Sequence, residues 1–163
     1  MKDKIKVLMV CHGNICRSPM AEYIMKDLVS RAGLADSFYI ASAATSTEEI
    51  WNGVGNPVYP PAKAQLAEHG IDCRGKRAVQ LAREDYNKYD YLIGMDSANI
   101  RNMNRMLGGD PEKKIYKLLS FAGSDRDISD PWYTGDFETT YRDVVEGCTA
   151  FLEFLRKNNN QLR

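Results

Sequence analysis

The chain has 163 residues, a length that fits one domain with a buried core. Apolar residues make up 44% of it and charged residues 27%, which is typical of a globular protein and excludes a disordered or fibrous one. Lysine plus arginine and aspartate plus glutamate each total 22, so no overall field favours nucleic acid or an anionic membrane as a partner.

Apolar runs and helical spacings alternate along the chain. Strands are predicted at residues 5–10, 38–43, 89–95 and 115–118. Helices are predicted at residues 20–32, 62–68, 97–107 and 137–157. This alternation predicts an α/β fold, a single domain over residues 1–163 in which an open four-stranded parallel sheet carries helices on both faces.

Two irregular stretches, residues 45–59 and 122–136, are rich in Gly, Pro, Ser, Asp and aromatic residues. Loops at the carboxyl ends of parallel strands form the ligand site, so these stretches are expected to form its walls. No segment has the twenty or so apolar residues that span a bilayer, and the first apolar run is too short for a signal peptide. We therefore expect a cytoplasmic protein whose four cysteines are free thiols.

The sequence CHGNICRSP at residues 11–19 follows the first predicted strand directly. Five residues between Cys11 and Arg17 allow the loop to curl, so that its backbone N–H groups point at one centre and bind a tetrahedral anion. Gly13 and Asn14 tolerate the left-handed backbone angles that such a curl requires. The segment therefore predicts an anion-binding loop.

A helix is expected to begin just after this loop, with Ser18 as its cap and Pro19 at its first position. Its positive end and Arg17 favour the thiolate of Cys11, which we expect to be an ionised nucleophile at neutral pH. The guanidinium fork suits two oxygens of a phosphoryl group. The alternative, a buried Cys11 and a surface arginine, is disfavoured because the motif lies between a strand and a helix.

Phosphoryl transfer to a thiolate also needs an acid that protonates the leaving oxygen. The segment DPWY at residues 130–133 offers the carboxyl group of Asp130 beside two aromatic residues that desolvate it and hold an aromatic leaving group. The same loop contains three competing aspartates, Asp125, Asp127 and Asp136. The loop sequence alone does not decide among them.

Taken together, CHGNICRSPMAE and DPW closely resemble the low-molecular-weight protein tyrosine phosphatases, and the resemblance covers nearly the whole chain. It implies that Cys11 is the nucleophile, that Arg17 binds the phosphate, and that Asp130 is first the general acid and then the base for water. The implied activity is hydrolysis of phosphotyrosine in proteins or peptides through a phosphocysteine intermediate. Inorganic phosphate is the product, and neither a metal nor another cofactor is needed.

The same resemblance implies supporting roles. Asn14, Ser18 and Ser42 belong to a hydrogen-bond network that fixes the loop, and Asp96 orients Arg17. Cys16 matches a second cysteine that pairs reversibly with an oxidised nucleophile.

Two departures affect this network. Ala44 occupies a position where glycine is frequent, and Gly75 stands where some members have a histidine. The network is therefore expected to be weaker or differently wired.

The residues expected to contact phosphate or substrate are His12, Gly13, Asn14, Ile15, Cys16, Arg17, Ser18, Trp51 and Trp132. Trp51 is interpreted either as one side of a slot for the phenyl ring or as an anchor of its loop to the core. Ile15 favours an aryl phosphate, because the related protein-arginine phosphatases usually have threonine at that position.

Two other classes stay open. Arsenate reductases of similar fold need further cysteines close together, whereas Cys73 and Cys148 stand apart in this sequence. A phosphate-binding module without turnover needs the loop but not Asp130. Hydrolysis of p-nitrophenyl phosphate in the presence of EDTA distinguishes an enzyme from such a module.

Overall fold

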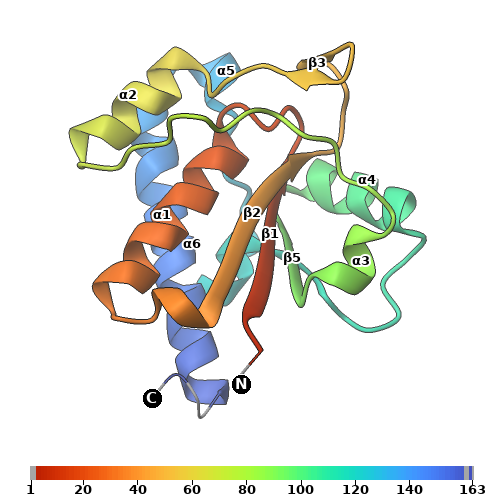
Figure 1. The fold of residues 1–163 in the computed structure, drawn as a ribbon, viewed down its shortest axis with the longest axis vertical. Helices are drawn as coiled ribbons and strands as arrows, with labels where there is room; N and C mark the ends of the chain where they lie inside the picture. The colour runs from red at the N-terminus through yellow and green to blue at the C-terminus, as the bar shows by residue number, and fades with distance from the viewer. Residues whose placement is uncertain (1–2, 160–161, 163) are drawn as a thin grey trace.

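A twisted parallel sheet forms the centre of the computed structural model, which describes residues 3–159 and 162 (Figure 1). In sheet order its strands are β2 (Phe38–Ala44), β1 (Ile5–Cys11), β5 (Tyr91–Gly94) and β6 (Ile115–Lys117). All three pairings are parallel. The predicted open four-stranded sheet is confirmed, and β5 is shorter at both ends than predicted.

Helices cover both faces of this sheet, as predicted (Figure 1). One face carries α1 (Arg17–Arg31), α2 (Pro60–Glu68) and α6 (Phe137–Asn158). The other carries α3 (Asp85–Lys88) and α4 (Ser97–Leu107). None of the helices in the described part of the chain is long and apolar enough to cross a membrane.

Strand β1 is apolar throughout because both of its faces are buried. Val7 and Met9 lie in the core cluster that contains Phe151 of α6, whereas Leu8 and Val10 lie in the cluster on the opposite face. Each of the four is at most 2% exposed. The strand therefore runs through the middle of the molecule and delivers Cys11 to the carboxyl edge of the sheet.

The irregular stretches contain short elements that were not predicted. The first holds a hairpin of β3 (Ile50–Trp51) and β4 (Val54–Gly55), and the second holds α5 (Pro131–Thr134). Two 3-10 turns complete the fold, η1 (Ala35–Ser37) and η2 (Leu118–Ala122). The Asn-Gly pair at residues 52–53, with positive φ at both positions, forms the hairpin turn.

Helix α1 begins earlier than expected. Its N-cap residue is Cys16, so the prediction that Ser18 caps it and that Pro19 occupies its first position was wrong. Proline is tolerated in the first turn because N–H groups there have no acceptor within the helix. The consequence is that both the N–H and the hydroxyl of Ser18 face Cys11.

Candidate active site

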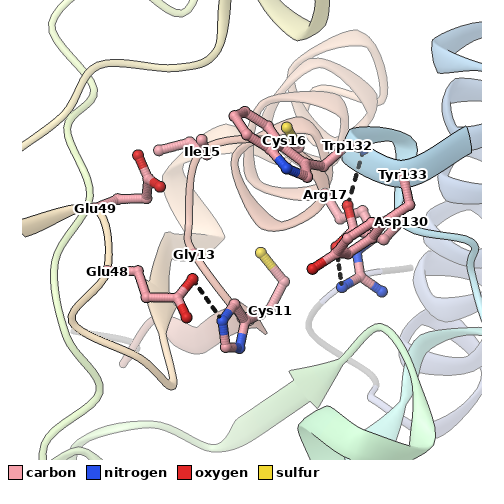
Figure 2. Close-up of a pocket in the computed structure, with 11 residues that line it drawn as sticks. Cys11, Gly13, Ile15, Cys16, Arg17, Glu48, Glu49, Asp130, Trp132 and Tyr133 are labelled. Carbon is pink, nitrogen blue, oxygen red and sulfur yellow. Dashed lines mark hydrogen bonds and ion pairs between the residues drawn. The ribbon is translucent and has the colours of Figure 1, made fainter. Parts of the chain in front are cut away.

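A pocket of about 110 Å³ opens at the carboxyl edge of the sheet (Figure 2). Predicted site residues that line it are Cys11, His12, Gly13, Ile15, Cys16, Arg17, Asp130 and Trp132. The lining also contains Tyr133, Glu48 and Glu49, and neither glutamate was predicted. Asn14, Ser18, Ser42 and Asp96 lie behind this lining and hold it in place.

The loop between β1 and α1 surrounds the Cys11 sulfur with hydrogen-bond donors. The backbone N–H groups of Asn14 and Ser18 both point at Sγ, each with a nitrogen–sulfur distance of 3.4 Å. Asn14 has the predicted left-handed backbone, with φ of 59°. Gly13 does not, so that part of the prediction was wrong; a side chain at Gly13 would instead crowd the Cγ of Glu49.

The orientation of the Asn14 amide is determined by a neighbouring backbone group. Val79 N–H donates to Asn14 Oδ1 at 3.1 Å, so the amide nitrogen must face the other way. From there it donates to Ser18 Oγ at 2.7 Å and to Ser42 Oγ at 2.9 Å. Both serine oxygens are therefore acceptors toward Asn14.

This arrangement directs the Ser18 hydroxyl hydrogen at the sulfur. Ser42 donates its own hydrogen to Glu22 Oε1 at 2.6 Å, which is consistent with its acceptor role toward Asn14. Ser18 accepts from Asn14 as well, and its hydrogen then points at Cys11 Sγ, 3.0 Å away, because the alternative acceptor is 3.5 Å away. A donor aimed at sulfur stabilises the thiolate more than the thiol.

Glu22 and Lys76 extend this network, although sequence reasoning assigned neither a role. Glu22 is only 4% exposed, and Lys76 Nζ lies 3.7 Å from its Oε1 and donates to the Ser42 carbonyl at 3.0 Å. Burial lowers the pKa of Lys76, and the Glu22 carboxylate opposes that shift. Lys76, the residue after Gly75, thus supplies a cation to this network. The sequence signal that could have identified Glu22 was its position, as an acidic residue, on the buried face of the helix predicted at residues 20–32.

Replacing Lys76 by methionine is expected to lower the free energy of unfolding by about 1–3 kcal/mol. The variant leaves Glu22 buried with one cation fewer and the Ser42 carbonyl without its donor. Lys26→Met is the control: Lys26 is closer to Glu22, at 2.6 Å, but its side chain is 43% exposed against 11% for Lys76. Water replaces an exposed partner, so this control is expected to lose less than about 1 kcal/mol in urea unfolding. An equal or larger loss for Lys26→Met contradicts the prediction.

Arg17 is buried beneath the pocket and fixed from behind. Its Nη1 donates to Asp96 Oδ2 at 2.6 Å and to the Ile128 carbonyl at 2.9 Å. Burial lowers the pKa of Arg17, but the Cys11 charge and the hydrogen bond to Asp96 outweigh it and raise the pKa above its ordinary value. Nη2 reaches toward the pocket, 3.5 Å from Asp130 Oδ2. The guanidinium is therefore charged and oriented before any ligand enters.

Asp130 occupies the N-cap of α5. Its Oδ1 accepts from the Trp132 N–H at 3.0 Å, which leaves Oδ2 toward Arg17 and the pocket (Figure 2). Trp132 packs against Tyr59 with ring centroids 4.7 Å apart. Together with Tyr133 it forms an aromatic wall beside the carboxyl group.

The three competing aspartates lie outside the pocket lining. Asp127 accepts from Lys117 Nζ at 2.9 Å, and Asp136 caps α6 by accepting from Thr139. These hydrogen bonds lower the pKa of both carboxyl groups. The backbone carbonyl of Asp125 accepts from Lys117. The structure therefore brings Asp130, and none of the other three, to Cys11 and Arg17.

All four cysteines are free thiols. Burial, and then the charge of Cys11, raise the pKa of Cys16 to about 12, so Cys16 is a neutral thiol at physiological pH. Cys73 and Cys148 are buried and do not line the pocket. Neither therefore joins Cys11 and Cys16 in the pocket lining, where the further cysteines of an arsenate reductase would be needed.

Trp51 does not lie where it was predicted. It is 79% exposed on the β3–β4 hairpin and is not part of the pocket lining, so it neither walls a slot nor anchors the loop to the core. Strand β3 begins just after Glu49 and carries the chain away from the rim. Glu48 and Glu49 occupy the side of the pocket where the tryptophan was expected.

Comparison with known proteins identifies the family. A family model described as low molecular weight phosphotyrosine protein phosphatase matches residues 6–161. The chain belongs to this family. A low molecular weight protein-tyrosine-phosphatase of Bacillus subtilis, YfkJ, is 38% identical over 94% of this chain and 97% of its own. The phosphatase of Sus scrofa is 40% identical over 92% of this chain and 95% of its own.

Solved structures of the family superpose on this phosphatase. The crystal structure of YfkJ covers 97% of this chain and 98% of its own with a TM-score of 0.90 at 37% identity. A Drosophila arginine phosphatase also matches, with a TM-score of 0.82 at 30% identity over 93% of this chain and 98% of its own. Because both share the fold, the substrate must be argued from the pocket.

Proposed function

We propose that this phosphatase hydrolyses phosphotyrosine in proteins or peptides, with Cys11, Arg17 and Asp130 as its catalytic residues. The observation that carries the proposal is the Cys11 sulfur, which lies among inward-pointing donors in the same pocket as a guanidinium and a carboxyl group. A single thiolate, anion binder and proton donor are together sufficient for phosphoryl transfer.

In the first step the Cys11 thiolate attacks phosphorus in line, and the bond from phosphorus to the tyrosyl oxygen breaks. Asp130 gives its proton to that oxygen, which leaves as neutral tyrosine. Arg17 and the loop N–H groups hold the equatorial oxygens, where negative charge is concentrated in the transition state. The product of this step is a phosphocysteine.

In the second step water attacks the phosphocysteine. Asp130, now a carboxylate, takes a proton from the water, and the sulfur–phosphorus bond breaks to release inorganic phosphate. The Ser18 hydroxyl, 3.0 Å from Sγ, stabilises the departing thiolate. Both steps use residues of this chain and neither uses a metal.

An aryl phosphate suits this pocket better than phosphoarginine. Ile15 lines the pocket with an apolar side chain that offers no acceptor to a guanidinium. Trp132 and Tyr133 supply an aromatic wall for a phenyl ring. We place the enzyme in the cytoplasm, because a mechanism built on a free thiol is supported by a reducing compartment and all four cysteines are unpaired.

The test is a panel of substrates on one preparation in the presence of EDTA. Phosphotyrosine peptide and p-nitrophenyl phosphate are expected to be hydrolysed, whereas phosphoserine and phosphoarginine peptides and the reduction of arsenate give little or no turnover. Preference for phosphoarginine, or dependence on added metal, contradicts the proposal. Phosphate binding without turnover of any substrate assigns the chain to a binding module.

A further inference from the structure

The rim of the pocket is acidic on the side opposite the aromatic wall. Glu48 and Glu49 line that side, and in the close-up view Cys11 lies between Glu48 and the side chains of Asp130 and Tyr133 (Figure 2). We call the two glutamates the acidic rim. They lie between β2 and β3, on a segment that the mechanism does not use.

Neither carboxylate of the acidic rim has a lysine or arginine partner within the described part of the chain. Glu48 Oε2 lies 3.0 Å from His12 Nε2, and Glu49 Oε1 accepts from Asn56 Nδ2 at 2.9 Å. The guanidinium of Arg77 donates to the Gly55 carbonyl at 2.9 Å and not to either glutamate. Both acidic groups are thus held at the pocket mouth, and no lysine or arginine in the described ranges neutralises them.

A phosphotyrosine substrate brings further negative charge into this pocket, so a cation beside the acidic rim becomes more favourable. Arg17 is the one lysine or arginine in the described lining, and it lies at the buried end, where the phosphate binds. With the ring of a phosphotyrosine in front of Cys11, as the proposed function requires, the residues that flank it in the chain would lie at the rim. An acidic flanking residue is repelled there, whereas a lysine or arginine is attracted.

We propose that the acidic rim makes this phosphatase select phosphotyrosine segments that carry lysine or arginine beside the phosphotyrosine. The proposal rests on the proposed function and specifies its substrate class. An ion pair at an exposed rim is only weakly stabilising. Two carboxylates acting together correspond to about a three- to tenfold higher kcat/KM for a basic segment than for a neutral one.

The test uses phosphotyrosine peptides that differ only in whether the flanking residues are lysine, alanine or glutamate. The expected order of kcat/KM is lysine, then alanine, then glutamate. The lysine preference should shrink as ionic strength rises from about 50 mM to about 500 mM, because salt screens exposed charges. Equal kcat/KM for the three peptides, or a preference for glutamate, overturns the proposal.

The double variant Glu48→Gln, Glu49→Gln assigns the preference to the rim. Its ratio of kcat/KM for the lysine and alanine peptides is expected to fall close to one. Each ratio compares two peptides on one preparation, so any unfolded fraction cancels. Glu153→Gln is the control, since this exposed residue lies in the last turns of α6, at the opposite end of the molecule from β3 (Figure 1). It should keep the full preference.

A double variant that retains the wild-type ratio overturns the assignment to Glu48 and Glu49. Failure of the proposed function gives a different result, because the wild type then hydrolyses neither p-nitrophenyl phosphate nor the alanine peptide. Hydrolysis of both, without discrimination among the peptides, leaves the phosphatase activity intact and removes the specificity claim alone.

Discussion

Cys11→Ser is expected to lower kcat for p-nitrophenyl phosphate by at least about a thousandfold. The N–H groups of Asn14 and Ser18 and the Ser18 hydroxyl stabilise a sulfur anion at this position. A serine hydroxyl stays protonated at neutral pH, so the nucleophile is lost while the loop and Arg17 remain. Inorganic phosphate should therefore still bind, which calorimetric titration of the variant measures.

Cys73→Ser is the matched control for this substitution. Cys73 is also buried and unpaired, but it does not line the pocket. Once circular dichroism shows that the Cys73→Ser variant is folded, its kcat is expected to lie within about twofold of the wild-type value. Ordinary turnover by Cys11→Ser removes Cys11 from the mechanism, and loss of phosphate binding together with turnover shows a collapsed loop instead.

Asp130→Asn is expected to slow hydrolysis according to the leaving group. For phenyl phosphate and phosphotyrosine, whose leaving oxygens need a proton, the loss in kcat/KM should be about a hundredfold to ten-thousandfold. For p-nitrophenyl phosphate, which releases a stable anion, the loss should be much smaller. Asparagine keeps an oxygen that accepts from the Trp132 N–H, so α5 keeps its cap while the acid is removed.

Asp125→Asn tests whether this effect is specific to Asp130. Asp125 lies on the same loop but outside the pocket, and its backbone carbonyl, rather than its carboxylate, accepts a hydrogen bond from Lys117. Its variant should hydrolyse every aryl phosphate at close to the wild-type rate. Equal losses for good and poor leaving groups in Asp130→Asn exclude Asp130 as the general acid.

Local sequence patterns predicted most of the fold. The apolar run of β1 and Gly108, which ends α4, are short-range signals, and the helix predicted at residues 97–107 has those bounds in the structure. The misplaced start of α1 shows the limit of such signals. Ser18 is a good cap residue, but its hydroxyl is engaged by Cys11 and Asn14, so contacts within the anion-binding loop override its preference for capping.

The contacts around Arg17 depended on the tertiary structure. Arg17 bonds Asp96, 79 residues away, and Ile128, 111 residues away. The choice of Asp130 over Asp125 has the same origin, because only the fold decides which carboxyl group on a loop turns inward. Without the family resemblance, the sequence left that choice open.

By itself, the sequence determined the alternating fold and predicted the nucleophile and its anion-binding loop, because strand, loop and helix are consecutive segments with local signals; the exact start of the helix was not among them. The tertiary structure alone decided the rest. In the structure Trp51 lies outside the pocket, and Glu48 and Glu49 lie at its rim. Lys76 lies beside the buried Glu22. These positions depend on contacts between segments that are distant in the sequence. The parallel order of the strands brings those segments to one edge of the sheet.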